Sequence, residues 1–413
     1  MLLYWHVAVS EDTQRHPTIM KTFLVTLVFL GADWPQFLGP TRDGTAPGPK
    51  PGTKAELLWK QDVGPGFAGP VIADGRVILF ERVKDRETIV SKDINTGQTV
   101  WTADYETKYQ DDFGFDDGPR SAPTVSGGRI YTFGAEGMLT CLDFKTGKKL
   151  WNVDTKARYG FHKGWFGAAG APLVEGNLVI LNIGGSKGAG IVAFNRETGA
   201  QAWTATDDEA SYSSGTVATI GGERHALFLT RAGFVDLDPA SGKVRFQFPW
   251  RSRNDASVNA ATALVSGDLV FISSSYRTGA ALLKVSGSKY EKIWSNDESM
   301  SNHYATSVLK DGYLYGFHGR QESGPALRCV ELRTGKVQWK DEDFGAGTLI
   351  LVDDQLLILR ENGELVWAAA TPKAFTIAAR TALLPGVVRA YPAYSNGVFC
   401  ARNTQTLGCW RLR

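Results

Sequence analysis

The chain has 413 residues, and its 43% hydrophobic and 21% charged residues are ordinary proportions for a globular protein. A formal net charge of +2 gives no global basic field, which argues against a nucleic-acid partner. Four cysteines do not make a disulfide scaffold in a chain of this length, and no CxxC or CxxCH motif occurs.

The first segment, residues 1–32, has the pattern of an export signal preceded by an upstream stretch. Met20-Lys21 is followed by the apolar run TFLVTLVFL and then by Gly31-Ala32, a small-residue exit. The run is too short to span a bilayer, and no cysteine follows it to carry a lipid. We therefore predict an exported protein, periplasmic or extracellular, without a transmembrane segment or lipid anchor. The alternative is that the run is a buried strand at the edge of the fold.

Eight copies of one element follow a short N-terminal extension (33–54). Each copy has an apolar run, a turn and a second apolar run, as in GPVIADGRVILF (69–80). Asp-Gly or Gly-Gly turns between β-branched and aromatic residues predict hairpins. The turns recur every 42 to 53 residues, at Gly75, Gly128, Gly176, Gly222, Gly267, Gly312, Asp354 and Gly397.

A third run, a Thr-Gly turn and a tryptophan complete most copies, as in FKTGKKLW (144–151) and RETGAQAW (196–203). Four strands in about 45 residues are typical of a propeller blade. We therefore predict an all-β protein whose residues 55–413 form a single eight-bladed β-propeller with four-stranded antiparallel blades. A β-helix, the alternative, would have shorter rungs. One short helix is predicted in TPKAFTIAAR (371–380).

The recurrent aromatic residue is predicted to hold blade to blade. Glycine supplies the positive φ of the turn, and the aromatic ring that follows can lie against the next blade. The predicted structural docking residues are Trp59, Trp101, Trp151, Trp203, Phe246, Trp294 and Trp339.

The two ends of the chain are predicted to share the last blade. AELLWKQDV (55–63) looks like a fourth strand without a preceding unit, and the eighth unit stops after its third strand. Pairing the two closes the ring and removes an exposed sheet edge. Cys400 and Cys409 would face each other in this blade, and both a disulfide and a reduced pair stay open.

The repeated DxxTGxxxW pattern, preceded by a PxxxxGxVY run, resembles the pyrroloquinoline-quinone-like (PQQ-like) β-propeller repeat family. The opening DWPQFLGPTRDG (33–44) is similar to that of exported planctomycete-type members, and the chain also resembles the outer-membrane assembly lipoprotein propeller. The resemblance covers residues 33–413 and implies the propeller fold. Some family members are quinoprotein dehydrogenases that bind PQQ and calcium, usually with adjacent cysteines, which this chain lacks. We expect no cofactor and no metal, and PQQ with Ca²⁺ is the alternative.

Topology predicts where a ligand would bind. In such a blade, the turns after strands one and three share one face, here called the turn face. The loops after strands two and four share the other, here called the loop face, and they hold nearly all the long irregular segments. Mixed aromatic, amide and charged groups are typical of binding surfaces. The candidates at the channel mouth are Phe67, Arg120, Trp165, Tyr212, Ser214, Asn259, Asn302, His303, Tyr304, Arg320 and Arg389. The alternative is a water-filled channel lined by satisfied polar groups.

Two other sequence patterns are candidates for metal sites, but neither has the spacing of such a site. DDFGFDD (111–117) could hold Ca²⁺, but it lacks the oxygen spacing of a calcium loop and is better read as a solvated acidic loop. His162, His303 and His318 lack the spacing of a zinc site.

We interpret the chain as a non-catalytic binding or scaffolding propeller of the cell envelope, and we expect it to be a monomer. Its ligand would be an envelope protein, a glycan or a small anion. The alternatives are a PQQ-dependent oxidoreductase and a polysaccharide hydrolase or lyase. The latter would need a carboxylate pair, for which Glu209 and Asp255 are the nearest candidates.

Overall fold

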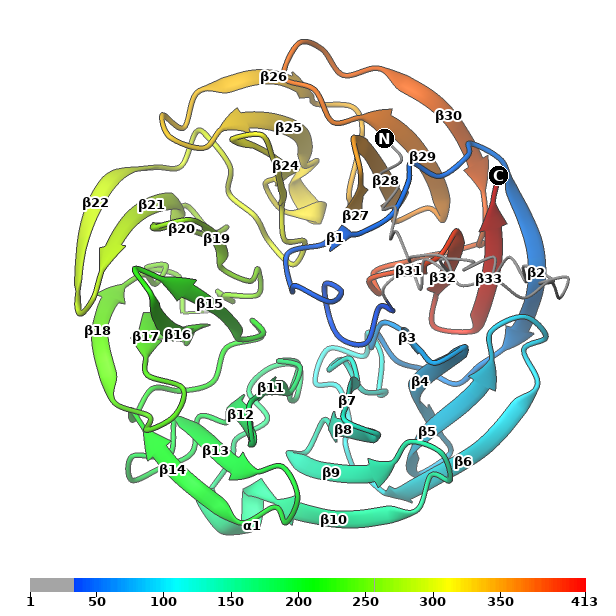
Figure 1. The fold of residues 1–413 in the computed structure, drawn as a ribbon, viewed down its shortest axis with the longest axis vertical. Helices are drawn as coiled ribbons and strands as arrows, with labels where there is room; N and C mark the ends of the chain where they lie inside the picture. The colour runs from blue at the N-terminus through cyan, green and yellow to red at the C-terminus, as the bar shows by residue number, and fades with distance from the viewer. Residues whose placement is uncertain (1–32, 256) are drawn as a thin grey trace, which may run out of the picture. The chain divides into compact units, whose positions relative to one another are not determined.

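The structure is a computed structural model that describes residues 33–255 and 257–413. The predicted export signal lies outside the described residues. Eight sheets are arranged as blades around a central axis, as predicted (Figure 1). Each blade has four antiparallel strands that follow one another outward from the axis, and within the described residues blade 7 has an additional inner strand.

The blades follow one another along the chain. The first four are β3 (Val71–Ala73), β4 (Arg76–Val83), β5 (Arg86–Asp93), β6 (Thr99–Glu106); β7 (Thr124–Ser126), β8 (Arg129–Phe133), β9 (Met138–Asp143), β10 (Lys149–Asp154); β11 (Leu173–Glu175), β12 (Leu178–Asn182), β13 (Ile191–Asn195), β14 (Gln201–Ala205); and β15 (Thr216–Ile220), β16 (Glu223–Leu229), β17 (Gly233–Leu237), β18 (Val244–Pro249). The last four are β19 (Leu264–Ser266), β20 (Leu269–Ser274), β21 (Gly279–Ser286), β22 (Lys289–Asn296); β23 (Val308–Lys310), β24 (Tyr313–His318), β25 (Ala326–Glu331), β26 (Val337–Asp341); β27 (Gly347–Val352), β28 (Gln355–Arg360), β29 (Glu364–Ala369), β30 (Ile377–Ala382); and β31 (Ala393–Ser395), β32 (Val398–Arg402), β33 (Thr406–Leu412) with β2 (Ala55–Asp62).

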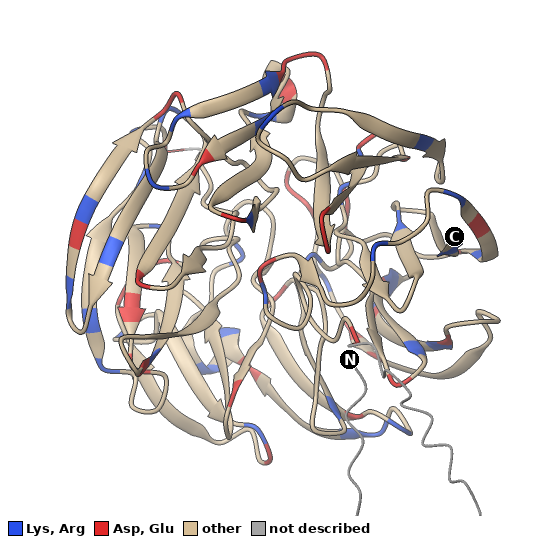
Figure 2. Cartoon of the chain, turned by 45° about the horizontal axis from the view of Figure 1, so that its top comes forward, with Lys and Arg blue, Asp and Glu red and all other residues tan. Residues whose placement is uncertain are grey.

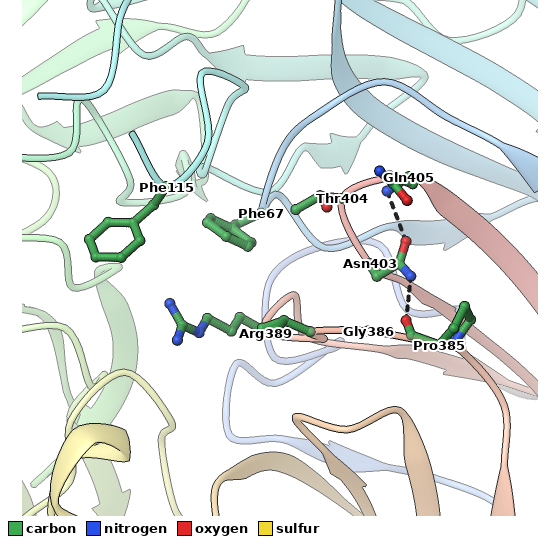
Figure 3. Close-up of a pocket in the computed structure, with 9 residues that line it drawn as sticks. Phe67, Phe115, Pro385, Gly386, Arg389, Asn403, Thr404 and Gln405 are labelled. Atoms are coloured by element: carbon green, nitrogen blue, oxygen red, sulfur yellow. Dashed lines mark hydrogen bonds between the residues drawn. The ribbon is translucent and has the colours of Figure 1, made fainter. Parts of the chain in front are cut away.

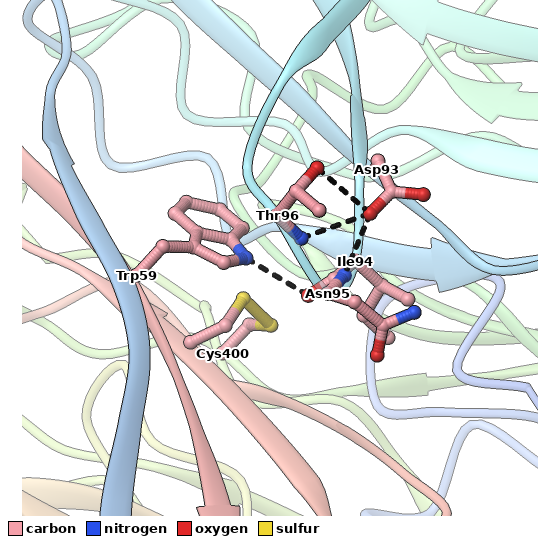
Figure 4. The surroundings of a disulfide bond; sticks show 7 residues. Trp59, Asp93, Ile94, Asn95, Thr96 and Cys400 are labelled. Carbon is pink, nitrogen blue, oxygen red and sulfur yellow. Dashed lines mark hydrogen bonds between the residues drawn. A yellow bond between two sulfur atoms is a disulfide. The ribbon is translucent and has the colours of Figure 1, made fainter.

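The ring closes within blade 8, as predicted. β2 pairs antiparallel with β33, with Ala55 opposite Leu412. Cys400 and Cys409 lie opposite each other in β32 and β33 and form a disulfide beside Trp59 of β2 (Figure 4). A crosslink across so short a loop stabilises a fold by about 2–3 kcal/mol in the chain-entropy account.

A buried arginine ties the last blade to the first. Arg402 of β32 donates to the carbonyl oxygen of Gly64 at 2.6 Å and to that of Phe80 at 3.4 Å. Burial lowers the pKa of Arg402 to about 10, and the carboxylates of Glu81 and Asp116 oppose that shift. The closure therefore uses side-chain contacts in addition to the strand pairing.

The Thr-Gly-Trp element joins neighbouring blades at both of its ends. The indole N–H of Trp101 in blade 1 donates to the carbonyl oxygen of Phe144 in blade 2, at 3.1 Å. The same ring covers Gly147, where a Cβ would lie 2.5 Å from the indole. Equivalent indole bonds come from Trp59, Trp151, Trp203, Trp294 and Trp339. Phe246, which has no N–H, packs instead on Tyr290 of blade 5 with ring centroids 4.9 Å apart.

Blade 7 reverses this arrangement. The other seven blades place the docking aromatic residue on the fourth strand, whereas in blade 7 Ala379 of β30 takes that register position and faces Trp367 of β29. Blade 8, the next in the ring, receives its fourth strand from the N-terminal part of the chain and has no Thr-Gly turn to cover. The large side chain therefore moves to the third strand, where Trp367 is fully buried.

The helix predicted in residues 371–380 is wrong. Ile377–Ala382 is strand β30, with a burial pattern that alternates along the strand. Its period of two matches a sheet face, and pairing with β29 outweighs the helix propensity of the alanines. The α-helix of the described chain is α1 (Thr155–Tyr159), where the side chain of Asp154 accepts from Ala157 N; a 3₁₀ turn, η1, spans Gln321–Ser323.

The N-terminal extension enters the channel. Residues 34–46, here called the plug segment, lie at the centre of the ring, where β1 (Thr45–Ala46) pairs in parallel with β27 (Figure 1). Trp34 forms a bridge with Ile72 of β3 and is buried. Phe37 packs against Tyr391 with ring centroids 4.9 Å apart, and Arg42 donates to backbone carbonyls that precede blades 3 and 4. The plug segment thus fills the axis on the side of the turn face.

Charge is dispersed over the molecule. In the view of Figure 2, Lys and Arg residues are interspersed with Asp and Glu residues around the ring. Within the described part of the chain, no helix is both long enough and apolar enough to cross a membrane.

Candidate functional site

The loop face brings the predicted residues into three groups. Phe67, Arg120, Trp165 and Tyr212 lie in the connections that lead into blades 1, 2, 3 and 4. His303, Tyr304, Arg320 and Arg389 lie in the connections around blades 5 to 8. Ser214, Asn259 and Asn302 are buried beneath the mouth of the channel.

Arg120 holds the first group together. Its guanidinium lies between two aromatic rings, 5.0 Å from the centroid of Phe67 and 5.3 Å from that of Phe166. Its Nε donates to the carbonyl oxygen of Phe166 at 2.9 Å, and its Nη2 is paired with the buried carboxylate of Asp111. A partly buried cation–π contact contributes about 1 kcal/mol. Because the charge is already neutralised, Arg120 positions the surrounding loops.

Four rings form a patch beside this arginine. The aromatic patch consists of Phe113, Phe115, Trp165 and Phe166, with ring centroids 5.4 to 6.3 Å apart along its contacts. Phe113, Phe115 and Trp165 are 54%, 57% and 41% exposed. The hydroxyl of Tyr212 accepts from the backbone N–H groups of Trp165 and Phe166, at 2.8 and 3.2 Å. The patch is therefore exposed but anchored.

The acidic loop explains how these phenylalanines reach solvent. Asp111 accepts from the N–H of Phe113 at 2.8 Å, and Asp117 accepts from the N–H of Asp111 at 2.7 Å. Asp116 accepts from Gly118 and from Gly66 across the blade boundary. The carboxylates thus satisfy the backbone of a tight loop, and the rings between them point outward. The sequence pattern contained this signal, but Phe113 and Phe115 were not among the predicted site residues.

A hollow of about 410 Å³ adjoins the aromatic patch (Figure 3). Arg389 extends into the same region as Phe67 and Phe115, and Asn403 bonds to Pro385 O at 2.7 Å across the far side. The lining residues are Phe67, Phe115, Pro385, Gly386, Val387, Arg389, Asn403, Thr404 and Gln405. Its wall combines apolar surface with one guanidinium.

Arg389 is held by a carboxylate that sequence reasoning missed. Its Nε donates to Glu361 Oε1 at 3.0 Å, and the hydroxyl of Tyr304 donates to the same oxygen at 2.8 Å. Burial, reinforced by the nearby carboxylate, raises the pKa of Tyr304 well above its usual value. Glu361 lies in the loop of blade 7 between β28 and β29, far from its partners in sequence.

His303 belongs to a second closed network. Gln321 donates through Nε2 to Glu322, so its Oε1 accepts from His303 Nδ1 at 2.6 Å. The other ring nitrogen then accepts from the hydroxyl of Tyr276 at 3.0 Å. The guanidinium of Arg320 lies 4.3 Å from the ring centroid of Tyr276. Burial lowers the pKa of His303, which keeps the imidazole neutral at pH 7.

The three buried candidates brace the loops below the mouth. Ser214 Oγ accepts from Ala171 N at 2.9 Å, which joins blades 3 and 4. Asn259 donates to two backbone carbonyls and accepts from Ser274 Oγ at 2.8 Å. Asn302 donates to Phe317 O at 2.9 Å. Each of these side chains therefore forms at least one hydrogen bond within the protein.

The carboxylates proposed for polysaccharide chemistry are paired separately. Glu209 lies 3.5 Å from Arg231, and Asp255 lies 3.4 Å from Arg251. Neither carboxylate is paired with the other across a cleft, and glycosidase chemistry needs two acids facing one substrate.

A quinone with calcium does not fit the described residues. The axis below the mouth is occupied by the plug segment and by Tyr391, whose hydroxyl bonds to the backbone of Thr306 across the channel. Within residues 33–255 and 257–413, no three His, Cys, Asp or Glu side chains form a group that could hold a metal ion. The disulfide is buried inside blade 8 and does not face the mouth.

Comparisons with known proteins give two kinds of relative. Residues 85–341 match a family model described as "Outer membrane protein assembly factor BamB". The protein of that name from Yersinia pestis is 23% identical over 262 residues, which cover 58% of this chain and 63% of the relative. Quinohemoprotein alcohol dehydrogenase ADH-IIG from Pseudomonas putida is 30% identical over 154 residues, which cover 36% of this chain and 21% of the relative.

Solved structures agree on the architecture. The quinohemoprotein alcohol dehydrogenase of Comamonas testosteroni superposes with a TM-score of 0.67 at 14% identity, covering 92% of this chain and 80% of that one. At this identity the likeness shows the fold alone, whereas the family match covers more than half of the chain. The chain belongs to the PQQ-like β-propeller family whose model is described as outer membrane protein assembly factor BamB.

Proposed function

We propose that this protein is a non-catalytic scaffolding propeller of the cell envelope that binds a protein partner on its loop face. The observation that carries the proposal is the exposed aromatic patch next to the hollow lined by Val387 and Arg389. Apolar clusters of this kind, rimmed by polar groups, are typical of protein interaction sites.

The patch has the properties of a binding hot spot. Aromatic rings are the side chains that most often dominate interface energies, and each buries about 150–250 Å² when covered. Here the loops that carry the rings are already fixed by Asp111, Arg120 and Tyr212. A partner therefore loses little free energy to ordering this surface when it binds.

The partner is assigned as a protein because of the family match, whose description names an assembly factor of outer membrane proteins. An apolar partner side chain in the hollow, with a hydrogen bond to Arg389 or Asn403, would complete the contact. A glycan or a small anion in the hollow is the outcome that would contradict this assignment.

The test uses two substituted proteins with equal numbers of changes. A photo-crosslinking residue at position 115 should capture a defined envelope protein, and the same residue at position 150 should not. Purified partner should then bind Phe113→Ser/Phe115→Ser/Trp165→Ser at least about 100-fold more weakly than the native protein. The control, Leu57→Ser/Leu150→Ser/Ile293→Ser, changes exposed apolar residues on outer strands and should bind normally. Equal crosslinking at both positions, or equal loss in the control, contradicts the proposal.

A quinone-dependent oxidoreductase is the second candidate, because of the identity to the alcohol dehydrogenase. Titration of the purified protein with PQQ and Ca²⁺, followed by absorbance and thermal shift, separates the two. Saturable binding would favour the oxidoreductase. Absence of binding at micromolar concentrations would favour the scaffold.

A further inference from the structure

A second cavity lies on the turn-face side of the plug segment, away from the aromatic patch. It measures about 430 Å³ and is bounded by the plug segment on one side and by the innermost strands β11, β15 and β19 on the other. The residues used below that line it are Arg42, Asp43, Glu175, Thr216 and Arg224.

Arg42 is a buried cation without a carboxylate partner among the described residues. Arg42 is only 4% exposed. Two of the five N–H groups of its guanidinium donate to backbone carbonyl oxygens, to that of Pro172 at 2.7 Å and to that of Gly215 at 3.3 Å. Burial lowers the pKa of Arg42 to about 9, and the nearby carboxylate of Glu175 opposes that shift. Placing a cation in such a site without a direct ion pair is unfavourable, because the carbonyls replace only part of its hydration.

The acidic groups around the cavity are already engaged. Glu175 forms a two-point ion pair with Arg224, at 2.7 and 2.9 Å. Asp43 accepts from the N–H of Thr45 at 2.9 Å and from the hydroxyl of Thr41 at 2.7 Å, and so closes its own turn. Neither carboxylate forms an ion pair with Arg42.

Two further features of the lining residues are consistent with a binding site in this cavity. Arg42 has a φ of +59°, a left-handed conformation that costs a non-glycine residue about 1–2 kcal/mol. Strain of this kind is often retained where it serves function. Thr216 is buried on the opposite wall, and it contributes a hydroxyl group to the lining.

We propose that this cavity binds a small oxyanion, the carboxylate or phosphate group of a small organic acid, with Arg42 as the central cation. The free N–H groups of Arg42 and the hydroxyl of Thr216 would donate to the anion. Charge-assisted bonds from a guanidinium to an oxyanion are among the stronger protein hydrogen bonds. The bound anion would join the plug segment to blades 3, 4 and 5, and the site does not depend on the proposed function of the loop face.

Thermal unfolding of the full chain tests this site, with inorganic phosphate and succinate as probes and chloride at matched ionic strength as the reference. A ligand that binds only the folded protein raises Tm in a saturable way. We expect such a rise with at least one probe, and we expect it to vanish in Arg42→Met. A rise that tracks ionic strength, or no rise with either probe at millimolar concentration, overturns the site.

Arg42 also anchors the plug segment, so Arg42→Met could fail to fold. Thr216→Val keeps the shape of the side chain and removes only the hydroxyl. It should leave the ligand-free Tm within a few degrees and weaken probe binding by roughly tenfold, the value of one hydrogen bond to a charged group. Arg86→Met, a change at an exposed arginine of blade 1, should leave binding unchanged. Equal affinity in Thr216→Val and the native protein, or equal weakening in Arg86→Met, contradicts the proposal.

Discussion

The indole of Trp101 in blade 1 lies directly over the backbone of Gly147 in blade 2, where a Cβ would come within 2.5 Å of the ring. Gly147 also has a φ of +71°. The glycine is therefore required for two reasons, one local and one between blades. The same residue that turns the chain in one repeat makes room for the aromatic ring of the repeat before it.

Replacing Gly147 should separate these two requirements. Gly147→Ala introduces an unfavourable backbone conformation and a clash with Trp101, and should lower the free energy of unfolding by about 2–5 kcal/mol. Gly128 has a similar φ of +74° but no atom within 4 Å of its Cβ position. Gly128→Ala should cost only about 1–2 kcal/mol. Equal shifts in Tm for the two variants would show that the ring contact contributes nothing.

The reversed pair of blade 7 predicts a compensating exchange. Trp367→Ala leaves a large cavity and should cost about 3–5 kcal/mol. Ala379→Trp alone should also destabilise, because the site beside Trp367 is already filled. The double variant should lose less unfolding free energy than the two single variants lose together, because one indole then occupies the shared position. A double-mutant cycle on the unfolding free energies measures this coupling, and additive effects would contradict it.

Removal of the disulfide should weaken the closure of the ring. Cys400→Ala/Cys409→Ala should lower stability by about 2–3 kcal/mol, and the Tm of the native protein should fall in reductant while that of the variant does not. Cys141 is buried and free, so Cys141→Ala serves as the control that keeps its response to reductant. An identical response to reductant in all three proteins would show that the bond does not stabilise the fold.

His318 should make stability depend on pH. Burial lowers its pKa to about 4, and its Nδ1 accepts from the N–H of Ser301 at 3.1 Å, which requires the neutral ring. A depressed pKa means that the stability is present above the unfolded value near 6.5 and is lost as pH falls toward 4. Because the side chain is partly exposed, we expect the loss to be about 1–2 kcal/mol.

His318→Asn provides the comparison, since its amide oxygen can accept the same N–H and does not titrate. The difference in unfolding free energy between the native protein and this variant should decrease steadily from pH 7 to pH 4. A difference that stays constant over this range would mean that His318 does not titrate in this way.

Local patterns predicted the blades well because each blade is a local structure. The turn spacing, the Thr-Gly-Trp element and the unpaired run 55–63 led to the eight blades and to the closure by β2. The same reasoning failed at residues 371–380, where alanine-rich composition favoured a helix but strand pairing with β29 decided the structure. The reversal at Trp367 follows from the missing turn of blade 8, which becomes visible only when the ring is closed.

The site was less predictable because its contacts connect distant parts of the chain. Position along the repeat placed Asn259 and Asn302 near the mouth, but it could not tell that their side chains turn into the protein. Glu361 pairs with Arg389 from another blade, and no pattern links the two. The acidic loop stands out in the sequence for its carboxylates, but it also exposes the rings of Phe113 and Phe115.

The N-terminal position of β2 and the plug segment has a consequence for the order of assembly. During synthesis both segments emerge before the strands they pair with, because β1 pairs with β27 and β2 pairs with β33. Blade 8 therefore cannot form until β33 has been made, and β2 stays without its sheet partner until then. Such long-range pairing slows folding and leaves strand edges open in the meantime. Removing β33 would leave β2 and β32 without their shared neighbour, so we expect completion of the propeller to be an all-or-none event that awaits β33.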